Sequence, residues 1–312
     1  MLSVAFTGVD HIALDACRRN GVLVSNCAGY SAAAVADLVF GLLISLYRNI
    51  PACNEVVRRE GTKDGLVGFE LEGKKFGVVG TGAIGLRVAA IAQAFGCEVL
   101  AYSRTKKDVP GIAYTDLDTL LSQCDIVSLH TPLNDSTRGL IGKEQLALMK
   151  KNAVLINTAR GPVVDSQALA EALNEERIAG ACIDVFETEP PVKKEHPLLN
   201  AKHVIATPHA AFATKEALVK RAVIVFDNPG TLTAGMEASA SLTASDGTAI
   251  YPYQNGKTEY YETREIVTKA AGPLVSKGNL HDYANVSAGE ALLTMGSDTI
   301  DLDIRSKQKE LD

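Results

Sequence analysis

The chain has 312 residues, of which 46% are hydrophobic and 22% charged, a composition that permits one large hydrophobic core or two smaller ones. Its net charge of -6 provides no overall positive field for a nucleic acid or an anionic membrane surface, so neither is expected as a partner. The six cysteines form no CxxC pair and no metal-ligand spacing. We therefore expect no metal site, and a reducing, cytoplasmic location.

Near the N-terminus, one apolar segment, Ala32 to Ile50, approaches the lower length limit for a membrane-spanning helix. Asp37 and Arg48 argue against a span. A helix that is apolar nearly all round must be buried on most sides, in a core or against a second subunit. We interpret it as an interface helix of a homodimer.

From Lys74 onward, short runs rich in β-branched residues alternate with helical patterns such as Gln167–Glu176. Strands that are apolar on both faces and are separated by amphipathic helices call for a parallel sheet covered on both sides. The predicted fold class is thus α/β, a Rossmann-type doubly wound parallel sheet, over residues 29–213. Its strands are expected at 76–80, 98–103, 125–130, 153–159, 181–186 and 203–209.

The pattern changes after Asp227. Asn228, Pro229 and Gly230 are expected to end a helix that begins at Thr214. The segment 229–312 is rich in Ser, Thr, Gly and Tyr, and its Asp-Gly and Asn-Gly pairs at 246–247 and 255–256 are typical of β-hairpins. We expect a small, mostly β tail there.

A GxGxxG motif follows the strand expected at 76–80 and precedes a helix. Its first glycine would make the tight turn, its second would let the backbone approach a pyrophosphate, and its third would allow close helix-strand packing. Free N–H groups at the helix start and the helix dipole would hold the phosphate charge. The alternative is a purely structural glycine turn. The motif predicts a dinucleotide site at Gly80, Gly82, Ala83, Ile84 and Gly85.

The residue at the end of the second strand bears on which dinucleotide binds. An NAD site usually has an acidic residue there, which binds the adenosine ribose. This chain has Ser103 instead, followed by Arg104, Lys106 and Lys107. A 2′-phosphate would meet no opposing carboxylate and several cations, so NADP is favoured over NAD. A solvated basic loop is the alternative.

Three polar residues each follow a predicted strand, at the edge where open α/β sheets bind ligands: Arg160, Glu189 and His209. Taken singly, such residues are more often structural than catalytic. Together with their surroundings, they resemble the D-isomer-specific 2-hydroxyacid dehydrogenases. The words FTGVDHIAL, NCAGYSAAAVADLVFGLL, GTGAIG, HTPLNDSTRGLI, NTARGPVVD, GACIDVFETEPP and TPHAAFAT carry the resemblance in order.

The resemblance implies a role for each of these residues. His209 would be the general acid and base, Glu189 its carboxylate partner, and Arg160 the anchor of the substrate's carboxylate and carbonyl. Asp184 resembles the residue that holds the nicotinamide carboxamide, although a strand-end cap is an equal reading. The backbone amides of Thr7 and Gly8 would receive the substrate carboxylate. The remaining positions implied to line the cofactor are Thr131, Pro132, Thr158 and Ala159.

The chemistry of reduction agrees with these roles. Reducing a 2-keto acid needs a proton donor that titrates near neutral pH, as imidazole does, and a neighbouring carboxylate favours the imidazolium. We expect an oxidoreductase that transfers a hydride between NAD(P) and a small 2-keto or 2-hydroxy acid.

Family members begin with a substrate domain that a C-terminal helix completes, and this chain enters near that domain's last strand. We therefore expect a remnant of it at 1–28, the dinucleotide domain at 29–213, a returning helix at 214–228 and an unplaced tail at 229–312. The alternative function is a catalytically impaired, NAD(P)-binding dimeric scaffold or a truncated gene product.

Overall fold

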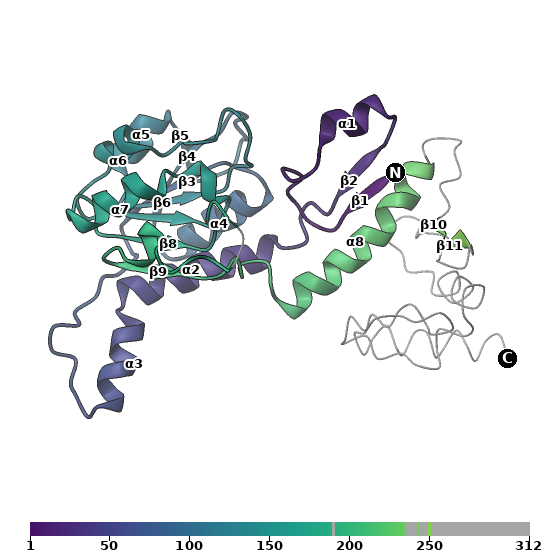
Figure 1. The fold of residues 1–312 in the computed structure, drawn as a ribbon. Helices are drawn as coiled ribbons and strands as arrows, with labels where there is room; N and C mark the ends of the chain where they lie inside the picture. The colour runs from purple at the N-terminus through teal and green to yellow at the C-terminus, as the bar shows by residue number, and fades with distance from the viewer. Residues whose placement is uncertain (189–190, 235–241, 244–248, 251–312) are drawn as a thin grey trace. The chain divides into compact units, whose positions relative to one another are not determined.

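The computed structural model describes residues 1–188, 191–234, 242–243 and 249–250. The chain divides into two compact units (Figure 1). One comprises Met1–Tyr30 together with the described residues from Lys215 onward, and the other comprises the described residues of Ser31–Thr214. The hairpin predicted at 255–256 and most of the predicted β tail lie outside the described residues.

The larger unit is built on a seven-stranded sheet in which every pairing is parallel, with the strand order β5-β4-β3-β6-β7-β8-β9. The predicted Rossmann-type fold is therefore confirmed. The strands are β3 (Lys75–Val79), β4 (Glu98–Tyr102), β5 (Ile112–Tyr114), β6 (Ile126–Leu129), β7 (Val154–Asn157), β8 (Gly180–Ile183) and β9 (Val204–Ala206). The sequence analysis missed β5, which is an edge strand of three residues.

The order of the strands reverses between β3 and β6. The chain runs outward from β3 through β4 to β5, and then returns to β6 on the other side of β3. Val79 at the end of β3 pairs with Tyr102 on one side and Leu129 on the other, so three strands end level. Ligands of open α/β sheets bind outside the carboxyl ends of the strands at such a switch point.

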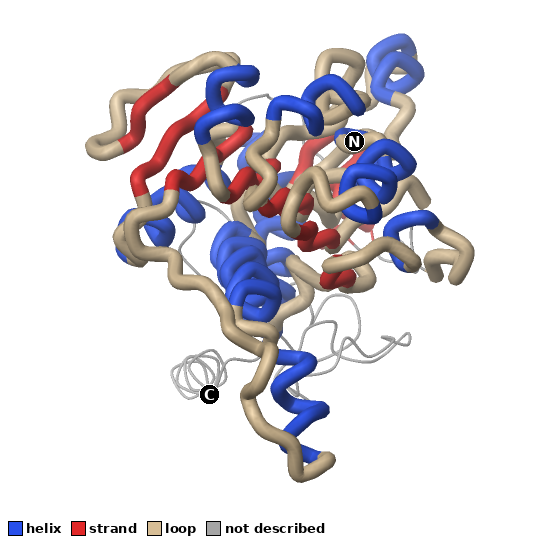
Figure 2. Tube along the Cα trace, turned by 90° about the vertical axis from the view of Figure 1, so that its left-hand side faces the viewer, coloured by secondary structure: helices blue, strands red, loops and turns tan. Residues whose placement is uncertain are grey.

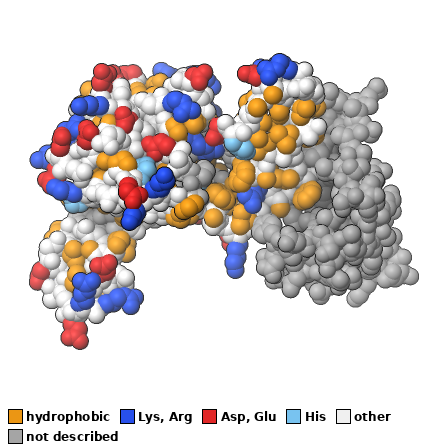
Figure 3. All heavy atoms as spheres, viewed as in Figure 1, with side chains coloured by type: hydrophobic (Ala, Val, Ile, Leu, Met, Phe, Trp, Pro, Cys, Tyr) orange, Lys and Arg blue, Asp and Glu red, His pale blue; other side chains and the backbone are white. Residues whose placement is uncertain are grey.

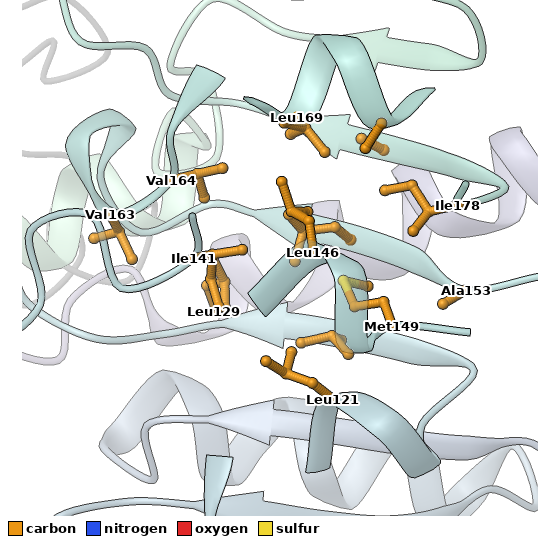
Figure 4. Close-up of a cluster of buried hydrophobic side chains, with 14 of the residues drawn as sticks. Leu121, Leu129, Ile141, Leu146, Met149, Ala153, Val163, Val164, Leu169 and Ile178 are labelled. Atoms are coloured by element: carbon orange, nitrogen blue, oxygen red, sulfur yellow. The ribbon is translucent and has the colours of Figure 1, made fainter. Parts of the chain in front are cut away.

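Helices cover both faces of the sheet and enclose two hydrophobic clusters (Figure 4 shows part of the first). Leu120, Leu146 and Leu169 belong to the first cluster, and Val39 and Val88 belong to the second. The helices of the first face are α5 (Leu117–Gln123), α6 (Lys143–Leu148), α7 (Ser166–Asn174) and the 3-10 turn η2 (Pro197–Leu199). Those of the second face are α2 (Ala32–Tyr47) and α4 (Ala83–Ala94), and a further 3-10 turn, η1 (Gly161–Val163), follows β7.

The single helix predicted over Ala32 to Ile50 is wrong in its extent. Asn49 adopts a left-handed conformation (φ 50), which ends the first helix, and Pro51 lies in the first turn of a second, α3 (Ile50–Arg58). The two helices are bent by 56° at this break. Helix α3 and the loop after it stand away from the strands in both views (Figures 1 and 2).

Within the described residues, no single helix is long and apolar enough to cross a membrane, although α2 and α3 taken together pass a test of length and composition. Helix α2 nevertheless buries Val39, Phe40 and Leu43 in its own unit. These side chains pack in the second hydrophobic cluster with Phe76 and Val88. Burial of this kind is what a core helix shows.

In the smaller unit, β1 (Leu2–Val4) pairs in parallel with β2 (Val24–Asn26), and α1 (Leu14–Arg19) connects them. Helix α8 (Lys215–Ala234) packs on this pair, since the Ser3 hydroxyl donates to the carbonyl of Val225 at 3.1 Å. The short strands β10 (Leu242–Thr243) and β11 (Ala249–Ile250) pair antiparallel on either side of the Asp-Gly pair that predicted a hairpin.

Helix α8 runs past the point where the sequence predicted its end. Asn228, Pro229 and Gly230 were expected to stop it, but helical backbone continues to Ala234. A proline removes one N–H donor and crowds the preceding turn, but it need not end a helix when both flanks continue the helical path.

Candidate functional site

The turn between β3 and α4 has the geometry that its glycines predict. Gly80 has φ +100, and a Cβ there would lie 2.7 Å from the carbonyl oxygen of His130. A Cβ at Gly85 would overlap the carbonyl of Gly80. At Gly82, in contrast, a Cβ would meet no atom within 4 Å. Gly80 and Gly85 are thus required by the fold itself, whereas the space over Gly82 is open to a ligand.

Polar groups near this turn are left for a ligand to satisfy. Gly82 is the N-cap of α4 and has no side chain to cap the first N–H groups of the helix. Among the described residues, the hydroxyls of Thr81, Thr131 and Thr158 are buried without a hydrogen-bond partner. Each threonine follows the carboxyl end of a strand, β3, β6 or β7. Buried polar groups are rarely left unpaired. These three hydroxyls and the uncapped N–H groups at the start of α4 therefore fit a bound dinucleotide.

The predicted cofactor-selecting residues lie just beyond β4. Ser103 is half-buried, and Arg104, Lys106 and Lys107 are exposed. The backbone N–H of Lys107 donates to the hydroxyl of Tyr114 on β5 at 3.1 Å, which fixes one point of this basic loop.

The loops after β6 and β7 are shaped by side-chain contacts to the backbone. Thr137 donates to the carbonyl of Pro132 at 2.6 Å in the loop that begins with Thr131. Asn157, 1% exposed, accepts from the Ala159 N–H and donates to the Arg160 carbonyl, both at 3.0 Å. Asn157 therefore folds the segment that carries Arg160. Sequence reasoning did not single it out, although it begins the word NTARGP.

The His209 backbone is held by the buried carboxylate of Asp184, which is 0% exposed. Its Oδ1 accepts from the Thr207 hydroxyl at 2.6 Å and from the Ala210 N–H at 2.8 Å, and its Oδ2 accepts from the Ala211 N–H at 3.0 Å. The His209 N–H donates to the Asp184 carbonyl at 2.7 Å.

These bonds outweigh the strain of the turn. His209 has φ 56, a left-handed conformation that costs a non-glycine residue roughly 1–2 kcal/mol. Hydrogen bonds to a charged group contribute about 1.5–3 kcal/mol each. Asp184 thus acts as a cap on the turn. Among the described residues, Oδ1 accepts two hydrogen bonds and Oδ2 one, so Oδ2 has a lone pair left for a further donor, such as the carboxamide that the resemblance implies.

A second histidine at the same sheet edge can be set aside. His130 follows β6, with Nε2 2.9 Å from the Ser128 hydroxyl. Burial lowers the pKa of His130 to about 3, so its imidazole is neutral at physiological pH. A proton donor for carbonyl reduction has to titrate near the working pH. His130 is therefore excluded as that donor.

Two of the predicted site residues, Thr7 and Gly8, lie in the smaller unit. The Asn26 amide donates to the Thr7 carbonyl at 2.7 Å and the Cys27 N–H to the Phe6 carbonyl at 3.1 Å, which fixes the loop at Thr7 and Gly8. Glu189 lies outside the described residues. Among the described residues, no group of three or more His, Cys, Asp or Glu side chains could hold a metal ion.

Comparison with known proteins identifies the family. Residues 40–211 match the description "D-isomer specific 2-hydroxyacid dehydrogenase, NAD binding domain", so the matched segment contains the glycine turn, Arg160, Asp184 and His209. The chain belongs to this family. The resemblance that the sequence motifs predicted is confirmed.

Among its relatives in this dehydrogenase family, the chain is 40% identical to a glyoxylate reductase of Aeropyrum pernix over 233 residues, 71% of this chain and 69% of the relative. It is 41% identical to a D-3-phosphoglycerate dehydrogenase of Methanocaldococcus jannaschii over 227 residues, 71% of this chain but only 43% of the relative. A solved D-lactate dehydrogenase from Aquifex aeolicus, complexed with NAD and lactic acid, has 34% identity and a TM-score of 0.69, covering 75% of this chain and 76% of that one.

Proposed function

We propose that this protein is an NAD(P)-dependent oxidoreductase that interconverts a small 2-keto acid and its 2-hydroxy acid. The observation that carries the proposal is the Asp184-held turn, because it fixes His209 after β9, at the same sheet edge as the glycine turn after β3 and Arg160 after β7. Glyoxylate, hydroxypyruvate and pyruvate are the substrates to test, since enzymes on such acids are among its relatives and structural neighbours.

The side chains divide the work of reduction as follows. When bound, the nicotinamide supplies the hydride. Arg160 binds the substrate carboxylate and stabilises the negative charge that develops on the carbonyl oxygen. His209 donates its proton to that oxygen, and in the reverse direction takes the hydroxyl proton. The family resemblance further assigns Glu189 as the carboxylate partner of His209, and Thr7 and Gly8 as substrate-binding residues.

The activity is tested by mixing the purified chain with NADPH or NADH and each 2-keto acid, and following the near-ultraviolet absorbance of the reduced nicotinamide. His209→Ala should lower kcat/KM by about 10²–10⁴-fold. His203→Ala is a matched control, because His203 has the same left-handed backbone (φ 55) but lies directly before β9, at the amino ends of the strands. Absence of turnover, with cofactor binding intact, would favour the scaffold alternative.

We further propose a preference for NADPH over NADH, supported by Ser103 in place of an acidic residue and by the exposed cations at 104, 106 and 107. Calorimetric titration should give the lower Kd for NADPH. Arg104→Ala should raise that Kd about tenfold to a hundredfold and leave the Kd for NADH unchanged, since only NADPH carries the 2′-phosphate. Tighter binding of NADH by the unaltered chain would contradict this preference.

A homodimer in a reducing compartment such as the cytoplasm completes the proposal. Exposed apolar side chains on α3 and in the following loop support the dimer: Val57 is 67%, Val67 86% and Phe69 60% exposed. Figure 3 shows apolar side chains where this lobe joins the sheet, with charged ones toward its tip. All six cysteines are free, which suits a reducing environment.

A further inference from the structure

Glu187, which follows β8, and His196, which precedes the 3-10 turn η2, form a carboxylate–imidazole pair. Glu187 Oε2 lies 2.9 Å from His196 Nε2. Glu187 and His196 are called the loop clasp below.

The hydrogen bonds of the imidazole fix its tautomer. The Leu198 N–H donates to His196 Nδ1 at 3.3 Å, so Nδ1 is an acceptor and the ring proton lies on Nε2, facing Glu187. The His196 ring packs edge-on against Phe186 with centroids 5.0 Å apart, and its side chain is only 14% exposed. Partial burial alone would raise the pKa of Glu187, but the nearby Ser166 side chain and the hydrogen bond with His196 hold it below its ordinary 4.5. The clasp is thus a charged acceptor paired with an imidazole donor.

The clasp closes directly on the segment that carries Arg160. Gly161 lies so close to the next loop that a Cβ there would overlap the carbonyl of Phe186 and the N atom of Glu187. The backbones after β7 and β8 are therefore in contact at the residue that follows Arg160. In the sequence, Glu187 also stands two residues before Glu189.

Building on the proposed function, we propose that Glu187 and His196 are positioning residues. They hold the backbone at Phe186 and Glu187 against Gly161, and so fix Arg160. Neither needs to contact substrate or cofactor. Because misplacement of a reacting group by about 1 Å can cost about 10²-fold in rate, loosening this contact should weaken turnover without affecting the distant glycine turn.

The test compares His196→Ala with His196→Gln, whose side-chain amide can still donate to Glu187. In the alanine variant, kcat/KM for the 2-keto acid should fall at least about tenfold, with the Kd for NADPH or NADH unchanged. The glutamine variant should recover most of the loss. Glu176→Ala is the control, because it breaks a 2.9 Å ion pair between Glu176 and Lys202, which lie before β8 and β9 at the amino ends of the strands.

Hydrogen exchange provides a readout that does not require turnover. The N–H groups of Val163 and Val164 donate to the carbonyls of Arg160 and Gly161, so their exchange reports on this segment. His196→Ala should speed it and leave residues 80–85 unchanged. The proposal is overturned if His196→Ala leaves kcat/KM unchanged. It is also overturned if this variant weakens cofactor binding and speeds exchange at residues 80–85 as much as at residues 163–164. If the unaltered chain shows no turnover, the proposed function fails. In that case, unchanged exchange at residues 163–164 in His196→Ala would also refute the positioning role of the clasp.

Discussion

Gly82 and Gly85 lie three positions apart, yet their surroundings assign them different roles. A Cβ at Gly85 would overlap backbone, whereas one at Gly82 would lie in open space, and Gly82 has an ordinary φ of -72. Gly85 therefore serves the packing of α4 on β3, and Gly82 serves the approach of a ligand.

Substitutions at Gly85 and Gly82 are predicted to have different effects, the first on stability and the second on cofactor binding. Gly85→Ala should lower the free energy of unfolding by about 1–3 kcal/mol, because the backbone has to move to admit the methyl group. Gly82→Ala should leave unfolding nearly unchanged and raise the Kd for NADPH and NADH at least about tenfold, because the methyl group occupies the space of the pyrophosphate. Chemical denaturation and calorimetric titration of both variants measure this. Equal loss of stability in the two would contradict the division of roles.

At the scale of elements, the amino ends of three strands are tied by one carboxylate. Asp125 precedes β6, accepts from the Lys75 N–H at the start of β3 at 2.9 Å, and accepts from Lys150 at 3.1 Å and Asn152 at 3.2 Å before β7. Partial burial alone would raise the pKa of Asp125, but these hydrogen bonds bring it below its ordinary 3.8.

The sign of the resulting pH dependence follows from that lowered pKa. Stabilisation by Asp125 is complete above its unfolded pKa and is lost as the pH falls through the lower folded value. The free energy of unfolding should therefore decrease as the pH drops from about 5 to about 2. Asp125→Asn should be less stable at neutral pH and show a flatter decrease, while Asp135→Asn, at an exposed position, should match the parent. A parallel decrease in Asp125→Asn and the parent would refute the assignment.

Elements whose signals are local were predictable from the sequence. The strands β3, β4, β6, β7 and β8 consist mostly of buried apolar residues, and the glycine turn is specified by its own residues and their neighbours. The break at Asn49 and the continuation of α8 through Pro229 were not, because a single asparagine or proline permits either outcome and the surrounding packing decides.

The same limit explains what was missed at the site. Asp184 was recognised by resemblance, but its bonds to residues 207–211 join positions more than twenty residues apart. The contact of Gly161 with Phe186 and the pairing of Glu187 with His196 depend on which strand ends the sheet places side by side. No spacing rule in a single sequence reports such contacts.

At the scale of the whole molecule, the exposed apolar side chains of α3 and its following loop predict self-association. Val67→Asp, at a position 86% exposed, should shift the protein from dimer to monomer in sedimentation velocity, because a charge cannot be buried in an apolar interface at little cost. Its Kd for NADPH should not change, since the glycine turn lies elsewhere in the unit. Val223→Asp, at an exposed apolar position of α8, is the control. An unaltered chain that sediments as a monomer would refute the dimer.

The left-handed backbone at His209 also limits how this chemistry could be moved to another protein. An imidazole grafted alone onto a foreign strand end would relax to an ordinary conformation and aim elsewhere, since nothing would hold φ near 56. The smallest transplantable piece is the end of one strand with its buried Asp184, together with the five-residue turn that follows the neighbouring strand. A designer would have to import both strand ends in parallel register before importing the histidine.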